Sequence, residues 1–173
     1  MSTSGASDLD PFQGELLRRA EAYLGEYLGK IRDCVLRLSE EQVWWRPNPA
    51  SNSVGNLLLH LCGNLTQWVL CGLGDLPDQR RRAEEFTADR TRSRAELLQA
   101  LESVVARCQS TIASLGAADL ASSRMVQGKD RTVLEAVVHP VEHMSYHTGQ
   151  IVYVAKMLAG EQAEIDFYPH LKR

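Results

Sequence analysis

Apolar residues recur at intervals of three and four along most of the chain, which is the period of an amphipathic α-helix. Four segments show this pattern, with approximate bounds 11–38, 53–73, 93–115 and 132–159. The pattern predicts four long helices, each with one apolar face that must be buried against its neighbours. We therefore expect an all-α fold, a four-helix bundle with long crossover connections.

Three helix starts are marked by the spacing of a capping box, in which a hydroxyl side chain is followed three residues later by Glu or Gln. The pairs are Ser39 and Gln42, Ser93 and Glu96, and Thr132 and Glu135. The first pair predicts a short helix at 40–45, and a short strand is expected around 124–127. Pro140 lies inside the last long helix and should kink it, because its ring removes one backbone hydrogen bond.

The segment 75–92 is rich in charged residues and predicts a long exposed connection, with Phe86 as its anchor on the bundle. Its run of three arginines, 80–82, could bind an anion, although a solvated loop is the favoured interpretation.

Residues 1–10 are small and polar and lack the apolar core of a signal peptide. We interpret them as a disordered lead and residues 11–173 as a single domain. No run of 18 apolar residues occurs, so neither a transmembrane helix nor a membrane partner is expected. The net charge of −3 argues against non-specific binding of nucleic acid. We expect a cytoplasmic protein.

The cysteines are Cys34, Cys62, Cys71 and Cys108, and none of them forms a C-x-x-C pair. Each falls at or near the apolar side of a predicted helix. We interpret them as reduced thiols that pack as small hydrophobic residues, which argues against a thiolate zinc site.

Three histidines, His139, His143 and His147, follow one another at intervals of four residues in the last long helix. Residues four apart lie one turn apart on the same side of a helix, and H-x-x-x-H recurs as a metal-ligand spacing. The spacing alone is equally compatible with two ordinary helix histidines. Four residues advance about 40° past a full turn. We therefore expect His147 in the middle of the apolar stripe, His143 at its edge, and His139 further round, behind the ligands or in solvent.

A second column of side chains lies beside the apolar stripe of the second long helix. Its members are Asn56, His60, Asn64, Gln67 and Cys71. A solvated helix face would carry Lys and Glu, and this column has neither. The column therefore favours the lining of a cleft over a solvated face.

The motifs Leu-Leu-Leu-His60-Leu-Cys-Gly-Asn64 and His143-x-x-x-His147-x-Gly149-Gln150-Ile151 resemble those of the DinB-like/YfiT-like family of helical bundle proteins. The resemblance covers nearly the whole chain. It implies a divalent metal ion held by His60, His143 and His147, and frequent homodimers. Some members are thiol-dependent S-transferases that use low-molecular-weight thiols such as bacillithiol or mycothiol, and one is a maleylpyruvate isomerase.

Two classes of function remain open at this point. In the first, the protein is an enzyme whose metal ion, zinc or nickel, activates a thiol or water against a small-molecule substrate. Asn64, Gln67 and Gln150 would orient that substrate, and Glu142 or Tyr146 could assist only if a neighbouring helix turned them inward. In the second, the bundle binds a metal ion or small ligand as a non-catalytic stress or sensor protein.

Overall fold

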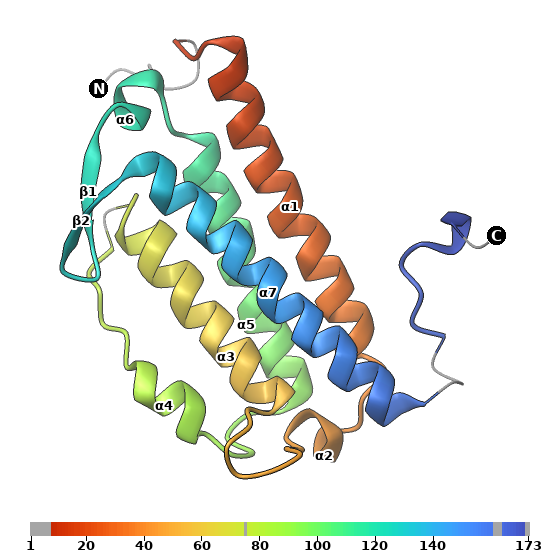
Figure 1. Cartoon of the computed structure of the whole chain (residues 1–173). Coiled ribbons are helices and arrows are strands. Elements are labelled where there is room, and N and C mark those ends of the chain that lie inside the picture. Colours follow the sequence, from red (N-terminus) through yellow and green to blue (C-terminus); the bar gives the residue numbers. More distant parts are fainter. Residues whose placement is uncertain (1–7, 75, 161–163, 172–173) are drawn as a thin grey trace.

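The computed structural model describes residues 8–74, 76–160 and 164–171. Its long helices are α1 (Pro11–Val35), α3 (Val54–Leu65), α5 (Arg94–Ala113) and α7 (Val133–Ala159). Helix α1 packs against α5 and α7, and α3 packs against the same two helices, as Figure 1 shows. The predicted all-α class is confirmed.

The core between these helices is built from aliphatic side chains. Those with essentially no exposed surface include Leu24, Ile31, Leu58, Leu61, Leu101, Ile112, Met144 and Ile151. Full burial of one such side chain contributes about 1.5–3 kcal/mol relative to leaving it exposed. This burial fixes the rotation of α3 and α7, and hence the faces that these two helices turn toward each other.

Side-chain caps begin the helices where the sequence predicted them. Ser39 and Ser93 each accept a hydrogen bond from the backbone N–H three residues on, and the reciprocal bonds of the capping box are present. Thr132 accepts in the same way from the backbone N–H of Glu135. Each such cap satisfies an N–H that has no partner within its helix. The predicted starts of α2 (Glu40–Val43), α5 and α7 are confirmed.

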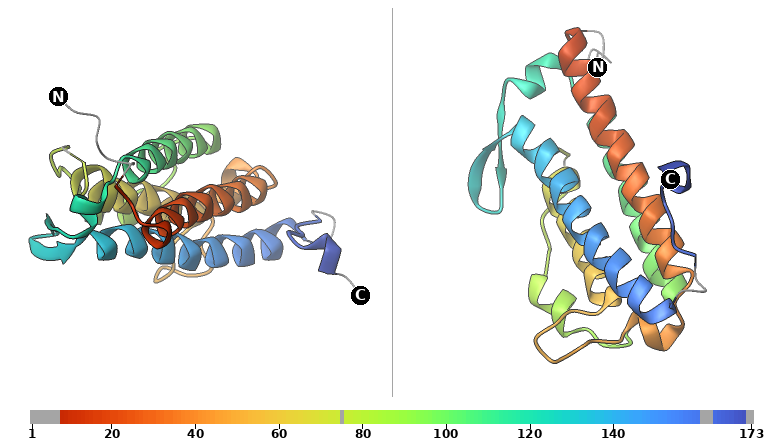
Figure 2. Two further views of the ribbon diagram at one scale, coloured as in Figure 1. Left: turned by 90° about the horizontal axis from the view of Figure 1, so that it is seen from above. Right: turned by 45° about the vertical axis from the view of Figure 1, so that its right-hand side comes forward.

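A two-stranded antiparallel hairpin precedes α7, formed by β1 (Ser123–Val126) and β2 (Lys129–Thr132). Gln127 and Gly128 join the strands with φ angles of 54° and 70°, the left-handed pair of a type I′ turn. The predicted strand near 124–127 is therefore one half of this hairpin. Figure 2 shows the hairpin standing beside the first turns of α7, after the short helix α6 (Ala117–Leu120).

Helix α3 passes directly into a π-helix, η1 (Thr66–Cys71). The predicted helix at 53–73 is therefore α-helical in its first part and π-helical in its second. A π-helical turn is rare and occurs often at functional sites.

The prediction that 75–92 is a solvated connection is wrong in its middle. This segment contains α4 (Arg82–Thr87), which packs against α3. Glu85 is only 9% exposed, and Asn56 Nδ2 donates to the backbone oxygens of Glu85 and Ala88 at 2.9 and 2.8 Å. A buried amide of α3 thus holds the segment onto the bundle, with Phe86 half-buried as expected.

Residues near both ends of the described chain pack on the core, among them Leu9 and Ile165. Residues 1–7 of the predicted disordered lead lie outside the described residues, whereas Leu9 packs on the core and Asp10 caps α1. Helix α7 continues through Pro140 to Ala159. Beyond it, the hydroxyl of Tyr168 accepts a hydrogen bond from Lys30 Nζ at 2.7 Å. The short 3-10 helix η3 (Pro169–Leu171) follows. In the described part of the chain, no helix combines the length and apolar character needed to cross a membrane.

Candidate metal centre

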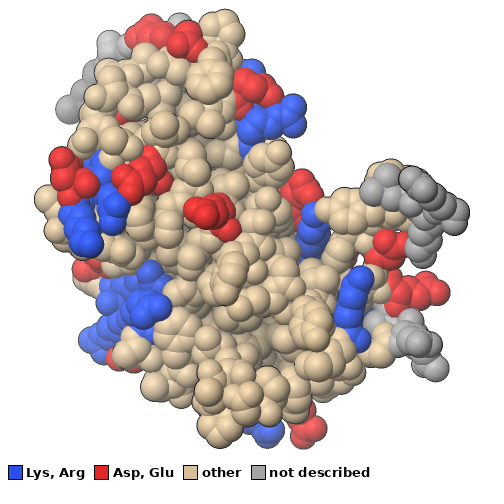
Figure 3. Space-filling model, in the orientation of Figure 1, with Lys and Arg blue, Asp and Glu red and all other residues tan. Residues whose placement is uncertain are grey.

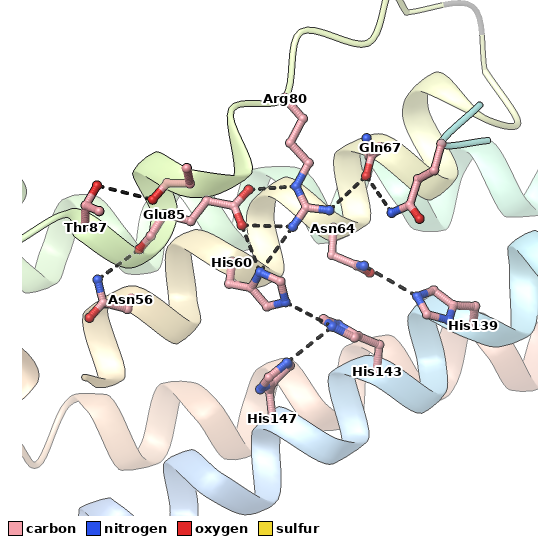
Figure 4. Close-up of polar contacts among 12 residues, drawn as sticks. Asn56, His60, Asn64, Gln67, Arg80, Glu85, Thr87, His139, His143 and His147 are labelled. Carbon is pink, nitrogen blue, oxygen red and sulfur yellow. Dashed lines mark hydrogen bonds and ion pairs between the residues drawn. The ribbon is translucent and has the colours of Figure 1, made fainter. Parts of the chain in front are cut away.

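Three imidazoles meet between α3 and α7. His60 comes from α3, and His143 and His147 come from adjacent turns of α7 (Figure 4). The Nε2 atom of His143 lies 3.1 Å from Nε2 of His60 and 3.3 Å from Nε2 of His147. One nitrogen from each of the three rings lies within 4.8 Å of the others, so the cluster could hold a metal ion.

His60 is oriented by a carboxylate on its other side. Its Nδ1 atom lies 2.8 Å from Oε2 of Glu85, and Arg80 donates to both oxygens of that carboxylate at 2.7 and 2.9 Å. Burial raises the pKa of Glu85, but the hydrogen bonds from Arg80 and His60 outweigh it, so the pKa lies below its ordinary value. An ionised carboxylate only accepts hydrogen bonds, so we assign the proton of a neutral His60 to Nδ1 and the lone pair to Nε2. Nη2 of Arg80 also lies 3.1 Å from this Nδ1, and in this assignment it donates to Oε2 of Glu85 at 2.9 Å.

Gly63 makes room for this contact. A Cβ atom on Gly63 would overlap Oε1 of Glu85 and come within 2.9 Å of Arg80 Nε. The glycine lies about one helical turn after His60, so the carboxylate and the guanidinium can lie directly against the backbone of α3. Arg80 also donates from Nη1 to Oε1 of Gln67 at 2.9 Å, which ties the ion pair to η1.

The two histidines of α7 are held differently. Oε1 of Gln150 lies 2.7 Å from Nδ1 of His147, so this Nδ1 donates the hydrogen bond and its Nε2 keeps a lone pair. The Nδ1 atom of His143 is buried and has no hydrogen-bond partner among the described residues. Gln150, predicted as a substrate-orienting residue, is therefore engaged with a histidine of the cluster.

Burial keeps the α7 histidines uncharged. It lowers the pKa of His143 to about 3, with further lowering by the neighbouring His147 and His60. Burial also lowers the pKa of His147, although the bond to Gln150 acts in the opposite direction. Both rings are therefore neutral at pH 7, and neutral imidazole is the form that binds a metal ion.

The three imidazole nitrogens that face one another are suited to binding a cation. With their protons on Nδ1, His60 and His147 present two acceptor nitrogens, and His143 has a single N–H to offer to both. A positive ion would accept the lone pairs of all three rings at once. Neutral imidazoles suit zinc, nickel and similar divalent ions.

We had predicted that His147 would lie in the middle of the buried stripe of α7, and this prediction is wrong. The buried face of α7 passes through Met144, Thr148 and Ile151, and His147 lies beside it, half-buried. Thr148 can occupy the buried position because its hydroxyl donates to the backbone oxygen of Met144 at 2.7 Å. The imidazole of His147 is thereby directed toward α3 instead of into the core.

His139 lies outside the cluster of three. Its ring stacks on Trp68 with centroids 3.9 Å apart, and its Nε2 lies 3.5 Å from Nδ2 of Asn64. The ring centroids of His139 and His143 are 5.5 Å apart. His139 therefore lies next to His143 on the wall of the cleft and outside the three converging histidines, and a place behind metal ligands stays a prediction.

Glu142 and Tyr146 are not turned inward by a neighbouring helix. Glu142 is exposed, and Tyr146 is 65% exposed, although its ring lies edge-on to His147 at 5.1 Å. We expected these residues to assist the site only if a neighbouring helix turned them inward, and among the described residues no helix does so, because both lie on the outer face of α7.

An open cleft of about 450 Å³ adjoins the cluster. Its lining residues are His60, Asn64, Gln67, Trp68, Arg80, Arg82, Gln127, His139 and His143. The predicted polar column of α3 and η1 therefore lines a cleft with three of its five members. Of the other two, Asn56 holds α4, and the thiol of Cys71 lies 3.6 Å from the backbone oxygen of Pro77.

The four cysteines are free thiols and none belongs to the cluster. Burial raises the pKa of Cys34 to about 11 and the pKa values of Cys62 and Cys108 to about 12. Burial also raises the pKa of Cys71, which is half-buried. All four are therefore protonated at pH 7.

Sequence reasoning missed the ion pair of Arg80 and Glu85. Both residues stand in a charged segment whose composition is that of a solvated loop. The available signal was Gly63, since a glycine inside a helix costs about 1 kcal/mol relative to alanine and often marks a close approach.

Comparison with known proteins places the chain in a family. Among solved structures, it is similar to a conserved protein from Enterococcus faecalis, with a TM-score of 0.69 and 17% sequence identity, over 83% of this chain and 97% of that one. At this identity the likeness shows the fold alone. No curated protein matches the chain. The sequence profile described as "Protein of unknown function (DUF1572)" matches residues 12–166. The chain therefore belongs to the DUF1572 family.

Proposed function

We propose that this protein is a metal-dependent enzyme of the DinB/YfiT type, which acts on small molecules as a thiol S-transferase or a hydrolase. The observation that carries the proposal is the convergence of three Nε2 atoms beside an open cleft. Three imidazoles leave coordination positions free, which is the arrangement of a catalytic rather than a structural metal site.

A divalent zinc or nickel ion held by His60, His143 and His147 would supply Lewis acidity that lowers the pKa of a thiol or a water molecule. The ionised Glu85 accepts the hydrogen bond from Nδ1 of His60, which makes Nε2 of that ring a stronger metal ligand. Asn64 and Gln67 line the cleft where a substrate would bind. The nucleophilic sulfur of a transferase would come from a soluble cosubstrate, because the thiols of the chain are protonated and lie outside the cluster.

A non-catalytic metal sensor is the alternative. This alternative is favoured by the position of Glu85, which contacts His60 directly and lies on α4, a surface helix of six residues. Binding or loss of the metal ion could shift this short helix and so change the surface that a partner would meet.

Homodimer formation is part of the proposal and is supported by the outer face of α7. Apolar side chains with at least 44% exposure recur there every four to eight residues, at Leu134, Val138, Tyr146, Tyr153 and Met157. Figure 3 shows this face as a broad tan area with an acidic group near its middle and few other charged residues. Light scattering of the purified protein would measure the mass, and Tyr153→Glu should shift it toward the monomer.

Metal analysis followed by activity assays tests the proposed function. The purified protein should contain about one divalent ion per chain, and it should act on members of a panel that pairs small thiols with electrophiles, or on activated esters and amides. His143→Ala serves as the inactive control. A metal-loaded protein that is inert to the whole panel would favour the sensor, and a protein that binds no metal would refute both.

A further inference from the structure

We infer that Gln67 is a positioning residue for His60, and that it acts through the buried ion pair beside that ring. The ion pair is formed by Arg80 and Glu85. The inference rests on the proposed function, because it treats His60 as a metal ligand of the same site. It gives Gln67 a role different from the substrate contact that its place in the cleft suggests. Figure 4 shows the contacts that run from Gln67 to His60.

Gln67 holds Arg80 by two routes. Its Oε1 atom accepts a hydrogen bond from Nη1 of Arg80 at 2.9 Å. Its Nε2 atom donates to Oδ2 of Asp78 at 2.7 Å, and Oδ1 of that carboxylate accepts from the backbone N–H of Arg80 at 3.0 Å. One amide side chain therefore restrains Arg80 at the guanidinium and, through Asp78, at the backbone.

Arg80 transmits this restraint to His60. The side chains of Arg80 and Glu85 are only 6% and 10% exposed. The guanidinium donates to both oxygens of the carboxylate, at 2.7 and 2.9 Å, and Oε2 of Glu85 lies 2.8 Å from Nδ1 of His60. Two parallel bonds between a planar guanidinium and a carboxylate fix the direction of both groups. A shift of the Arg80 guanidinium therefore moves the oxygen that orients the His60 ring.

The hydrogen bonds of Gln67 leave little of its amide for a substrate. Its Oε1 also accepts from Nε2 of Gln127 at 2.8 Å, so two donors occupy the two lone pairs of this oxygen. Asn64 lines the same cleft and differs in this respect, because its buried Oδ1 has no hydrogen-bond partner among the described residues. Of these two amides, Asn64 has the oxygen that a substrate can use, and Gln67 serves the network behind His60.

The first test observes the ring nitrogens of His60 by nitrogen-15 NMR in the metal-free protein. In the wild type, the proton on Nδ1 is held by Glu85 and should give a downfield signal that is protected from exchange with water. Gln67→Met keeps the length of the side chain and removes its hydrogen bonds, so this signal should be lost. Gln127→Ala is the matched control, because it removes one bond to Gln67 and leaves both routes to Arg80. The signal should persist in this variant.

The second test is a double-mutant cycle on the affinity for Zn²⁺. Gln67→Met should weaken binding about tenfold, at the lower end of the effect of residues that orient a metal-binding histidine. Gln127→Ala should change it by less than about twofold. In the Glu85→Gln background, Gln67→Met should cause no further loss, because the contact through which Gln67 acts is already broken. Losses that fail to add in this way are the mark of residues in one network.

Three results would overturn the inference: a signal retained in Gln67→Met, a signal lost equally in Gln127→Ala, or losses of Zn²⁺ affinity that simply add. None of them would affect the proposed function, which depends on metal content and activity. If the purified protein bound no metal, the proposed function would fail instead. The NMR comparison of Gln67→Met with Gln127→Ala would then still decide whether Gln67 orients His60.

Discussion

The two sides of the histidine cluster are built on different principles. On the α3 side, His60 is buried and backed by an ion pair that rests on a glycine. On the α7 side, His147 is backed by one amide, and Nδ1 of His143 has no partner among the described residues. The α3 side is therefore fixed by charge and shape, whereas the α7 side is fixed mainly by the helix that carries it.

This difference indicates which side adapts to a ligand. A buried ion pair is costly to disturb, because loss of one partner leaves the other charged and buried. A neutral imidazole with few polar partners can change its side-chain angles at low cost. We expect His60 to act as the fixed reference of the site and the α7 pair to adjust around it.

The largest effect should follow removal of a ligand. His60→Ala, His143→Ala and His147→Ala should each reduce the bound metal to background, because two imidazoles hold a divalent ion far more weakly than three. His139→Ala should retain most of the metal, since this ring stacks on Trp68 outside the cluster. Metal content per chain is the measurement, and circular dichroism controls for folding. Equal losses in all four variants would show that His139 is a ligand.

Two glycine substitutions compare the sides directly. Gly63→Ala should displace Glu85 and Arg80, which would weaken metal binding by about 10–100-fold and destabilise the protein by about 1–3 kcal/mol. Gly149→Ala on α7 has open space around its new Cβ and should stabilise the protein by about 0.5–1 kcal/mol. Denaturant unfolding and metal titration measure both effects. If Gly63→Ala behaved like Gly149→Ala, the close contact with Glu85 would not be a feature of the folded protein.

Among the residues that hold the histidines, the partner on the α3 side should matter more for metal affinity than the partner on the α7 side. Glu85→Gln removes the charge that orients His60 and should weaken metal binding by about 10–100-fold. Gln150→Ala removes a neutral partner from His147 and should weaken it by less than about tenfold. Competition with a coloured chelator gives both constants. A larger loss for Gln150→Ala would reverse the comparison.

Replacement of the cysteines should have the smallest effect on the site. The variant with alanine at all four positions should bind metal like the wild type, although the loss of Cys34 and Cys108 from the core will reduce stability. In the wild type, a thiol reagent at pH 7 should modify Cys71 faster than Cys34, Cys62 and Cys108, whose pKa values are about 11 or 12. Loss of metal from Cys71→Ala alone would contradict the three-histidine site.

The helices and two of the histidines could be predicted because their signals are local. Periodicity and capping spacings located the helices, and the four-residue spacing of His143 and His147 put both on one side of α7. The place of His60 in the cluster came from family resemblance. The contacts of Glu85 and Arg80 depend on how a charged segment folds back over α3, and no local pattern encodes that path. The buried position that we had predicted for His147 is taken by the next residue, Thr148. Thr148 can be buried because its hydroxyl donates to the backbone oxygen of Met144.

The π-helix at the end of α3 has a consequence for comparing sequences. A π-helical turn corresponds to a regular α-helix that has received one additional residue. In an alignment of relatives, a chain that keeps the α-helical form through 66–71 should be one residue shorter there, and the gap belongs inside this segment. An ungapped alignment through it would pair Gln67 and Trp68 with residues on a different side of the helix. Equivalents of these two cleft residues should therefore be identified by position in space.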